Sequence, residues 1–413
     1  MTIQFQFGQK LLKKALLVTA ASILTLSAGS VLAATQVTGF GSNPGSLNMY
    51  KYVPAGVPAN APLVVAMHGC TQTAAAYEAA GWNKLADTYK FYVVYPEQVS
   101  GNNQNKCFNW FEPGDIGRGA GEALSIKQMV DNMKTNYSID ANRVFVTGLS
   151  AGGYMVNVML ATYPDVFAGG APFSGGPYKC ATTMNDAFTC MSPGVDKTGQ
   201  QWGDLIRAAY NNTGRKPLIS IWHGDADYTV KQMNQTEEMQ AWTNVHGISE
   251  TPTTSNTVAG YPHKVYGNGQ VEIYTITGMG HGTPVDPSAG CGTAGAYILD
   301  KKICSSKLVA DFWGLTGGGT TTTTAATTTT TSIGGTTSTA ATTTTTSTTT
   351  TTTVAATCYT ASNYAHVQAG RAYNSMGTAK ANGSNQSMGL YNMFYKSTLK
   401  MTGPNYYVVG TCP

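Results

Sequence analysis

Charged residues are scarce in this sequence: Lys, Arg, Asp and Glu make up 11% of its 413 residues. Removing the first 33 residues, which contain three lysines and no acidic residue, lowers the formal net charge of +4 by three. Nucleic acids and anionic membrane surfaces select strongly basic proteins, so neither is an expected partner of a nearly neutral chain.

Long apolar runs are also missing. The apolar stretch at 15–26 is shorter than the roughly 20 residues that a membrane span needs, and no later segment approaches that length. Three lysines (Lys10, Lys13 and Lys14) precede it and small residues follow it up to Ala33, which is the pattern of a secretory signal peptide. We therefore expect residues 1–33 to be removed and the mature protein to be secreted to the extracellular space.

None of the cysteine spacings is typical of a zinc site. An even number of cysteines, eight, in an exported chain predicts disulfides instead. Their connectivity is not fixed by the sequence, and pairing in chain order is the simplest arrangement. It gives Cys70/Cys107, Cys180/Cys190, Cys291/Cys304 and Cys358/Cys412.

A tract of Thr, Ala, Ser and Gly at 317–353 divides the chain. It has no charge and almost no large apolar side chain, so its composition predicts a disordered tether. We place a large single-core domain at 34–315, the flexible linker at 316–356, and a small domain at 357–413 that bracketing cysteines close.

Within 34–315, short apolar runs that suit buried strands alternate with amphipathic stretches. The predicted strands are 63–67, 92–95, 144–146, 218–222 and 271–276, and the predicted helices are 122–133, 152–163 and 230–245. This alternation predicts an α/β fold with a parallel or mostly parallel sheet covered by helices on both faces.

Ser150 lies in Gly148-Leu149-Ser150-Ala151-Gly152, directly after the strand at 144–146 and before a predicted helix. A G-x-S-x-G in this context is the nucleophile elbow of an α/β-hydrolase. Its glycines permit a sharp turn that presents the serine at the carboxyl edge of the sheet. A glycine-flanked serine can also simply make a tight turn, so the assignment depends on the partners that follow.

In this fold the catalytic order along the chain is serine, acid, histidine. Of the six histidines, His68 and His223 come too early in the chain for that order, and His366 lies beyond the linker. His246 is at a predicted helix end and His263 enters a predicted strand, which leaves His281, in a glycine-rich loop after the strand at 271–276. Asp225 and Asp227 both follow the strand at 218–222. We favour Asp227 as the acid that orients His281, with Asp225 bracing the turn.

The oxyanion of the transition state needs hydrogen-bond donors. The backbone N–H of Ala151, after the nucleophile, is the expected first donor. The second should come from the loop after the strand at 63–67, where we choose the N–H of Cys70. Cys70 is expected to be half of a disulfide, with Cys107, and not a reactive thiol. No metal or cofactor is implied.

Motifs outside the serine pentapeptide carry a resemblance. They include His68-Gly69-Cys70, the stretch 107–111 with Arg118 and Glu122, and the ending that begins Cys358-Tyr359. With the linker they make the mature chain similar to the extracellular short-chain-length polyhydroxyalkanoate depolymerases. That family implies hydrolysis of poly(3-hydroxybutyrate), the triad Ser150, Asp227 and His281, and an oxyanion hole formed by the histidine-bearing loop. Phe108 departs from the tryptophan that the family pattern leads us to expect.

The expected function is therefore that of a monomeric secreted esterase acting on a solid polyester surface. The segment 357–413 supports this, because it has no acidic residue and seven tyrosines, which suit an uncharged surface. Most of these aromatics could equally form the core of a small β-rich domain. Two alternatives stay open: a feruloyl or acetylxylan esterase with a carbohydrate-binding appendage, and a non-catalytic surface-binding protein.

The cysteine pattern gives a first test. Peptide mapping of the mature protein under non-reducing conditions should find no free thiol and should link Cys358 to Cys412. An alkylatable Cys70 would contradict the predicted disulfide in the oxyanion loop.

Overall fold

The computed structural model describes residues 33–211, 214–317, 357–375, 378–391 and 395–410. Residues 1–32 of the predicted signal peptide and 318–356 of the predicted linker lie outside these ranges. The described residues form two compact units, 33–99 with 108–317 and 100–107 with 357–410.

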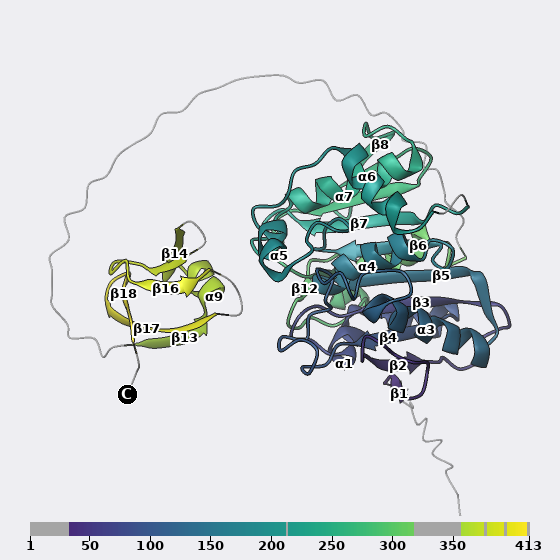
Figure 1. Ribbon diagram of the computed structural model, residues 1–413, viewed down its shortest axis with the longest axis horizontal. Coiled ribbons are helices and arrows are strands. Elements are labelled where there is room, and N and C mark those ends of the chain that lie inside the picture. Colours follow the sequence, from purple (N-terminus) through teal and green to yellow (C-terminus); the bar gives the residue numbers. More distant parts are fainter. Residues whose placement is uncertain (1–32, 212–213, 318–356, 376–377, 392–394, 411–413) are drawn as a thin grey trace, which may run out of the picture. The chain divides into compact units, whose positions relative to one another are not determined.

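The first unit alternates strands and helices (Figure 1). Its strands are β1 (Thr35–Val37), β2 (Asn48–Tyr52), β3 (Ala61–Met67), β4 (Tyr92–Glu97), β5 (Ile139–Leu149), β6 (Gly169–Phe173), β7 (Leu218–Gly224), β8 (Thr254–Val258), β9 (Tyr261–Tyr266), β10 (Val271–Ile276), β11 (Thr283–Val285) and β12 (Ile298–Asp300). Its α-helices are α1 (Ala74–Tyr77), α2 (Trp82–Tyr89), α3 (Gly121–Asn136), α4 (Ala151–Thr162), α5 (Met184–Met191), α6 (Gly199–Ala209), α7 (Met233–His246) and α8 (Ser305–Phe312). Two short 3-10 helices are η1 (Glu78–Ala80) and η2 (Pro287–Ala289).

Ten strands form one sheet in the order β1-β2-β4-β3-β5-β6-β7-β10-β9-β8. The strands from β4 to β10 in this order are parallel, while the pairs at both edges are antiparallel. The carboxyl ends of β5, β7 and β10 therefore meet at one edge of the sheet, which is where α/β folds carry their ligand sites.

Helices cover both faces of the sheet. On one face, Trp82 of α2 and Trp313, just after α8, pack with Phe145 of β5. The Trp313 ring stacks on Phe145 at 4.8 Å and on Trp82 at 5.8 Å between centroids. Helices α3, α4, α6 and α7 contact one another in sequence on the other face. The first unit thus has the predicted α/β-hydrolase architecture.

Each predicted strand and helix of this unit is present, although helix 230–245 begins only at Met233. The apolar-run criterion missed β6, whose sequence is Gly-Gly-Ala-Pro-Phe. Its glycines follow from packing: a β-carbon at Gly170 would lie 2.6 Å from Leu160 Cδ1 and 2.9 Å from Val156 Cγ1 of α4. The strand is therefore buried, although it lacks the large apolar side chains from which a buried strand is predicted.

The second unit is β-rich, as predicted. Its elements are β13 (Cys358–Ser362), α9 (Asn363–Gln368), β14 (Ala372–Ser375), β15 (Thr378–Ala381), β16 (Ser387–Leu390), β17 (Lys396–Gly403) and β18 (Tyr406–Val409). They form two antiparallel three-stranded sheets, β13-β17-β18 and β14-β15-β16. Met388, Leu399 and Tyr407 are buried in its core. Tyr373, Tyr395 and Tyr406 are exposed.

No helix in the described ranges is long and apolar enough to cross a membrane.

One carboxyl group lies deep in the first unit: Glu238 of α7 is 0% exposed. Its Oε1 accepts a hydrogen bond from Asn157 Nδ2 at 2.5 Å, and its Oε2 has no partner among the described residues. Burial raises the pKa of Glu238 to about 8, despite the opposing effect of the Asn157 hydrogen bond.

This raised pKa predicts a stability that depends on pH. Folded Glu238 holds a proton that the unfolded chain releases near its ordinary pKa, so stability is lost as the pH rises towards 8. Between pH 5 and 8 the free energy of unfolding of the wild type should fall by roughly 3 kcal/mol more than that of Glu238→Gln. Urea unfolding at each pH, followed at the transition of the first unit, measures this free energy.

Glu250→Gln, at an exposed carboxylate of the same unit, is the matched control and should follow the wild type. Parallel curves for Glu238→Gln and the wild type would contradict a protonated Glu238.

Candidate active site

Ser150 occupies the turn between β5 and α4 in a strained backbone conformation, with φ 58° and ψ −119°. Neighbouring chain segments enforce this turn. A β-carbon at Gly148 would lie 2.5 Å from the Gly152 carbonyl oxygen, and one at Gly152 would lie 2.5 Å from that of Met67. Strain of this kind costs about 1–3 kcal/mol and persists only where the surroundings hold it. The Ser150 N–H also donates to the Phe173 carbonyl at 2.9 Å.

Asp227 and His281 form a buried hydrogen-bonded pair. The distance from His281 Nδ1 to Asp227 Oδ2 is 2.7 Å. The other carboxylate oxygen accepts the N–H groups of Thr229 and Val230, each at 2.9 Å. A carboxylate can only accept here, so Nδ1 carries the proton and Nε2 presents its lone pair.

The charge on Asp227 is maintained in spite of burial. Burial alone would raise the pKa of Asp227, but the adjacent His281, by charge and by hydrogen bond, holds that pKa below its ordinary value. The nearby His223 acts in the same direction, at 3.6 Å from Asp227 Oδ2. An ionised partner of this kind fixes the imidazole tautomer and stabilises an imidazolium.

His281 Nε2 is buried and has no hydrogen-bond partner among the described residues. Its lone pair is therefore not consumed by the fold. Ser150, Asp227 and His281 follow β5, β7 and β10 at the same sheet edge. In enzymes of this kind, the hydrogen bond from the serine hydroxyl to the histidine is often long without substrate and tightens in the reacting complex.

Asp225 has a separate position. It is exposed, and its Oδ1 accepts the Gly278 N–H at 2.7 Å in the loop that leads to His281. Of the two aspartates that the sequence offered, Asp227 contacts the imidazole and Asp225 braces its loop.

The two residues predicted to donate to the oxyanion, Ala151 and Cys70, directly follow Ser150 and Gly69 in the chain. Ala151 is the first residue of α4, where backbone N–H groups have no partner within the helix. Residues 68–70, the oxyanion turn, lie close to Ser150, because a β-carbon at Gly69 would be 3.3 Å from Ser150 Cβ. Cys70 and Cys107 are each disulfide-bonded, and the bond between the two stays a prediction.

A buried hydrogen-bond network supports the turn before Cys70. His68 Nε2 accepts the Gln98 N–H at 3.1 Å, so His68 Nδ1 donates to the Gly69 carbonyl at 2.7 Å. The Gln98 side chain in turn donates to Glu122 of α3. Burial, with Asp115 nearby, raises the pKa of Glu122 well above its usual range, against the hydrogen bonds that it accepts. His68 thus shapes the loop, and both of its ring nitrogens form hydrogen bonds there.

Sequence reasoning missed the roles of several supporting residues. Gln72 accepts the Gly69 N–H at 2.9 Å and donates to the Ala296 carbonyl at 2.9 Å, across 224 residues of sequence. Phe108, where tryptophan was expected, is fully buried with its ring 5.0 Å from that of His68. Neither role has a local sequence signal, because each depends on a segment distant along the chain.

Two of the predicted disulfides are confirmed. Cys180 is bonded to Cys190 and Cys291 to Cys304. The predicted Cys358–Cys412 bond lies outside the described residues at Cys412, although Cys358 is disulfide-bonded.

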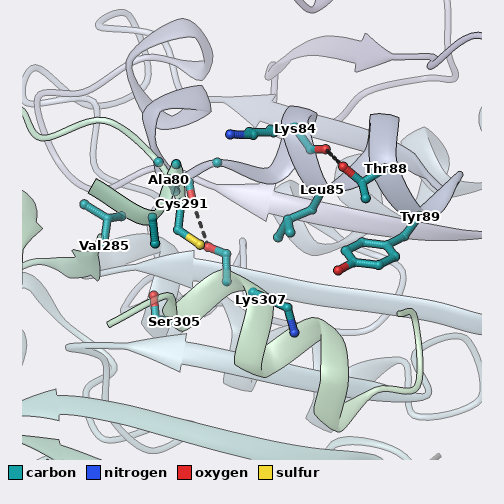
Figure 2. A pocket seen from close by; sticks show the side chains of 14 residues that line it. Ala80, Lys84, Leu85, Thr88, Tyr89, Val285, Cys291, Ser305 and Lys307 are labelled. Carbon is teal, nitrogen blue, oxygen red and sulfur yellow. Dashed lines mark hydrogen bonds between the residues drawn. The ribbon is translucent and has the colours of Figure 1, made fainter. Parts of the chain in front are cut away.

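Figure 2 shows a pocket of the first unit on the side where α2 faces α8. Lys84, Leu85 and Tyr89 of α2 line it opposite Ser305 and Lys307 of α8. It includes Cys291 but neither Ser150, Asp227 nor His281. It is therefore not the candidate active site.

Comparison with known proteins gives consistent matches. The model of the family "Esterase PHB depolymerase" matches residues 47–288. A poly(3-hydroxyalkanoate) depolymerase C of Paucimonas lemoignei is 67% identical over 315 residues, which are 74% of this chain and 76% of that protein. A feruloyl esterase B of Talaromyces funiculosus is 37% identical over 271 residues, or 62% of this chain and 76% of that protein.

A solved structure supports the fold. The acetyl xylan esterase from Aspergillus awamori aligns with a TM-score of 0.60 at 29% sequence identity, covering 69% of this chain and 100% of that one.

The geometry predicts unequal effects at the two aspartates. Asp227→Asn should lower kcat for a soluble butyrate ester by about four orders of magnitude, because an amide favours the wrong imidazole tautomer. Ser150→Ala and His281→Ala should cost several orders of magnitude as well. Asp225→Asn keeps an acceptor for the Gly278 N–H and should change kcat by less than about threefold.

Steady-state kinetics with folding checked by circular dichroism makes the comparison. If Asp225→Asn were crippling and Asp227→Asn mild, the acid would be Asp225.

Proposed function

Because this chain belongs to the esterase PHB depolymerase family and is a carboxylic ester hydrolase, we propose that it hydrolyses solid poly(3-hydroxybutyrate) through Ser150, Asp227 and His281. The observation that carries the mechanism is the 2.7 Å bond between His281 Nδ1 and Asp227, which leaves the Nε2 lone pair free to act as a base. The high identity to a poly(3-hydroxyalkanoate) depolymerase supports the substrate.

Acylation begins when Ser150 Oγ attacks the ester carbonyl and His281 Nε2 takes the hydroxyl proton. The carbonyl oxygen becomes an oxyanion beside the N–H groups of Ala151 and Cys70. Losing one such donor typically costs about 3 kcal/mol of transition-state stabilisation. When the tetrahedral intermediate collapses, the imidazolium gives its proton to the alcohol oxygen, and the alcohol end of the polymer leaves.

Deacylation repeats these steps with water. His281 removes a proton from water, the hydroxide attacks the acyl-enzyme, and the proton returns to Ser150 Oγ. Asp227 stays ionised throughout and stabilises the imidazolium, which its lowered pKa favours. The products are a hydroxyl-ended and a carboxyl-ended fragment, released into solution once they are short.

We assign the remaining parts of the chain to delivery. Residues 1–33 serve as the secretion signal, 34–315 as the catalytic domain, 316–356 as the tether and 357–413 as the polymer-binding domain. Three exposed tyrosines of the second unit, Tyr373, Tyr395 and Tyr406, supply flat apolar contact area for an uncharged polymer. A tether raises the local concentration of the catalytic domain at the polymer surface without contacting the substrate.

The alternative substrate class comes from the feruloyl and acetylxylan esterases, which are more distant relatives. A non-catalytic role does not fit a carboxylic ester hydrolase. Clearing of an opaque poly(3-hydroxybutyrate) suspension by the purified protein, without release of ferulate or acetate from plant polysaccharide, is the expected result. The opposite pattern would replace the polymer with a polysaccharide ester.

The division of labour gives a further prediction. A chain ending at Gly317 keeps the hydrogen bond from Thr316 to Asp311 at the end of the first unit. It should hydrolyse a soluble short-chain ester at nearly the wild-type rate, but adsorb to polymer film and erode it at least about tenfold less. Film mass loss and depletion of protein from solution measure these effects.

The full-length Ser150→Ala variant is the matched control, because it should bind film without eroding it. Loss of soluble-ester activity in the truncated chain, equal to its loss on film, would overturn the tether assignment.

A further inference from the structure

Tyr297 occupies an energetically unfavourable position that the fold maintains. It lies inside the segment closed by the Cys291–Cys304 disulfide, directly before β12, with φ 61°. This left-handed region costs a residue with a β-carbon roughly 1 kcal/mol or more. Tyr297 is 38% exposed, so the cost of its backbone conformation is not offset by full burial of the side chain.

Backbone contacts hold the residue beside the candidate site. The Tyr297 carbonyl accepts the Thr283 N–H at 2.9 Å, two residues after His281. The preceding carbonyl, of Ala296, accepts the Gln72 side chain that also holds the oxyanion turn. Tyr297 is therefore fixed relative to both halves of the catalytic machinery.

The Tyr297 ring contacts the catalytic imidazole. The ring centroids of Tyr297 and His281 are 6.1 Å apart, and the ring planes meet at 78°. Exposed large apolar side chains are few in the described residues of the first unit: Val53, Met184, Tyr228 and Tyr297. Among these, Tyr297 has its ring against the imidazole of His281.

The chemistry of His281 defines which part of the substrate this ring meets. In the proposed mechanism His281 gives its proton to the alcohol oxygen, so the leaving alcohol lies next to the imidazole. In a polyester that alcohol is the next hydroxyacyl unit, which is uncharged and largely apolar. A half-exposed aromatic ring offers such a unit a flat contact surface at low entropy cost.

We propose that Tyr297 binds the hydroxyacyl unit on the alcohol side of the scissile ester, next to His281. This inference rests on the proposed function. It makes Tyr297 a substrate-contacting residue that distinguishes a polymeric alcohol from a small one. Its contact exists only until the alcohol leaves, so it acts on acylation and not on deacylation.

Two esters that form the same butyryl-enzyme test the proposal. Methyl butyrate releases methanol, whereas methyl 3-(butyryloxy)butanoate releases methyl 3-hydroxybutyrate when its butyryl ester is cleaved. For Tyr297→Ala, kcat/KM should fall about tenfold for butyrate release from the second ester and stay within about twofold for the first. The steady-state rate after a 4-nitrophenyl butyrate burst, which reports deacylation, should not change.

Further variants separate the ring from its backbone. Tyr297→Phe keeps the ring and should retain the wild-type ratio of the two kcat/KM values. Tyr297→Gly relieves the left-handed strain while removing the ring, so it should show the same loss of discrimination as alanine even if the alanine variant folds poorly. Tyr137→Ala, before β5 at the opposite sheet edge from Ser150, controls for loss of an aromatic ring.

Contrary outcomes are distinct. If the ring variants lower both esters and deacylation equally, Tyr297 positions His281 and the substrate-contact proposal fails. If they leave the ratio at its wild-type value, the proposal also fails. A wild type that hydrolyses both esters but clears no polymer suspension would instead contradict the proposed function.

Discussion

The turn between β5 and α4 leaves no space for a β-carbon at Gly148 or Gly152, and the arrangement of the site depends on this close approach. A β-carbon at Gly148 would meet the backbone of α4, and one at Gly152 would meet the carbonyls of Met67 and His68 at the end of β3. One steric constraint thus strains Ser150, directs it out of the sheet edge, and brings the oxyanion turn against it. The strain at φ 58° is held by two strands and a helix, so it survives without a ligand.

Buried acids are treated differently according to their task. His281, by its charge and by its hydrogen bond, keeps the pKa of Asp227 low in spite of burial, with further lowering by His223 and the Val230 N–H. Glu238 accepts only the Asn157 amide, and its pKa rises instead. Burial is similar at the two sites, so the number and charge of the donors decides which carboxyl stays ionised. A low-charge protein can therefore still place one stable anion beside the candidate catalytic histidine.

The segments around the site are tied to each other across long stretches of sequence. Gln72 joins the oxyanion turn to Ala296, the Cys291–Cys304 disulfide closes the segment that carries Tyr297, and Asp225 braces the loop of His281. Loops that carry reacting groups are ordinarily the least stable parts of a fold. Here they are cross-linked, which favours an ordered candidate site.

The sequence by itself determined the architecture of the first unit, the β-rich character of the second and the candidate triad. It could do so because these features have local signals: apolar runs of strand length, a glycine-flanked serine between strand and helix, and an acid and a histidine after later strands. Two short disulfide loops were predictable for the same reason.

Tertiary structure alone decided the rest. Strand β6 is made of small residues because α4 packs on it, and the antiparallel edge strands lack the apolar runs of the centre. Met388, which has the appearance of a surface residue in a polar stretch, is buried. The support of His68 by Gln98 and Glu122, and the contact of Tyr297 with His281, join residues that only the folded sheet brings together. Contacts between distant segments leave no periodicity or spacing in the sequence, because each depends on how elements pack and not on the residues beside it.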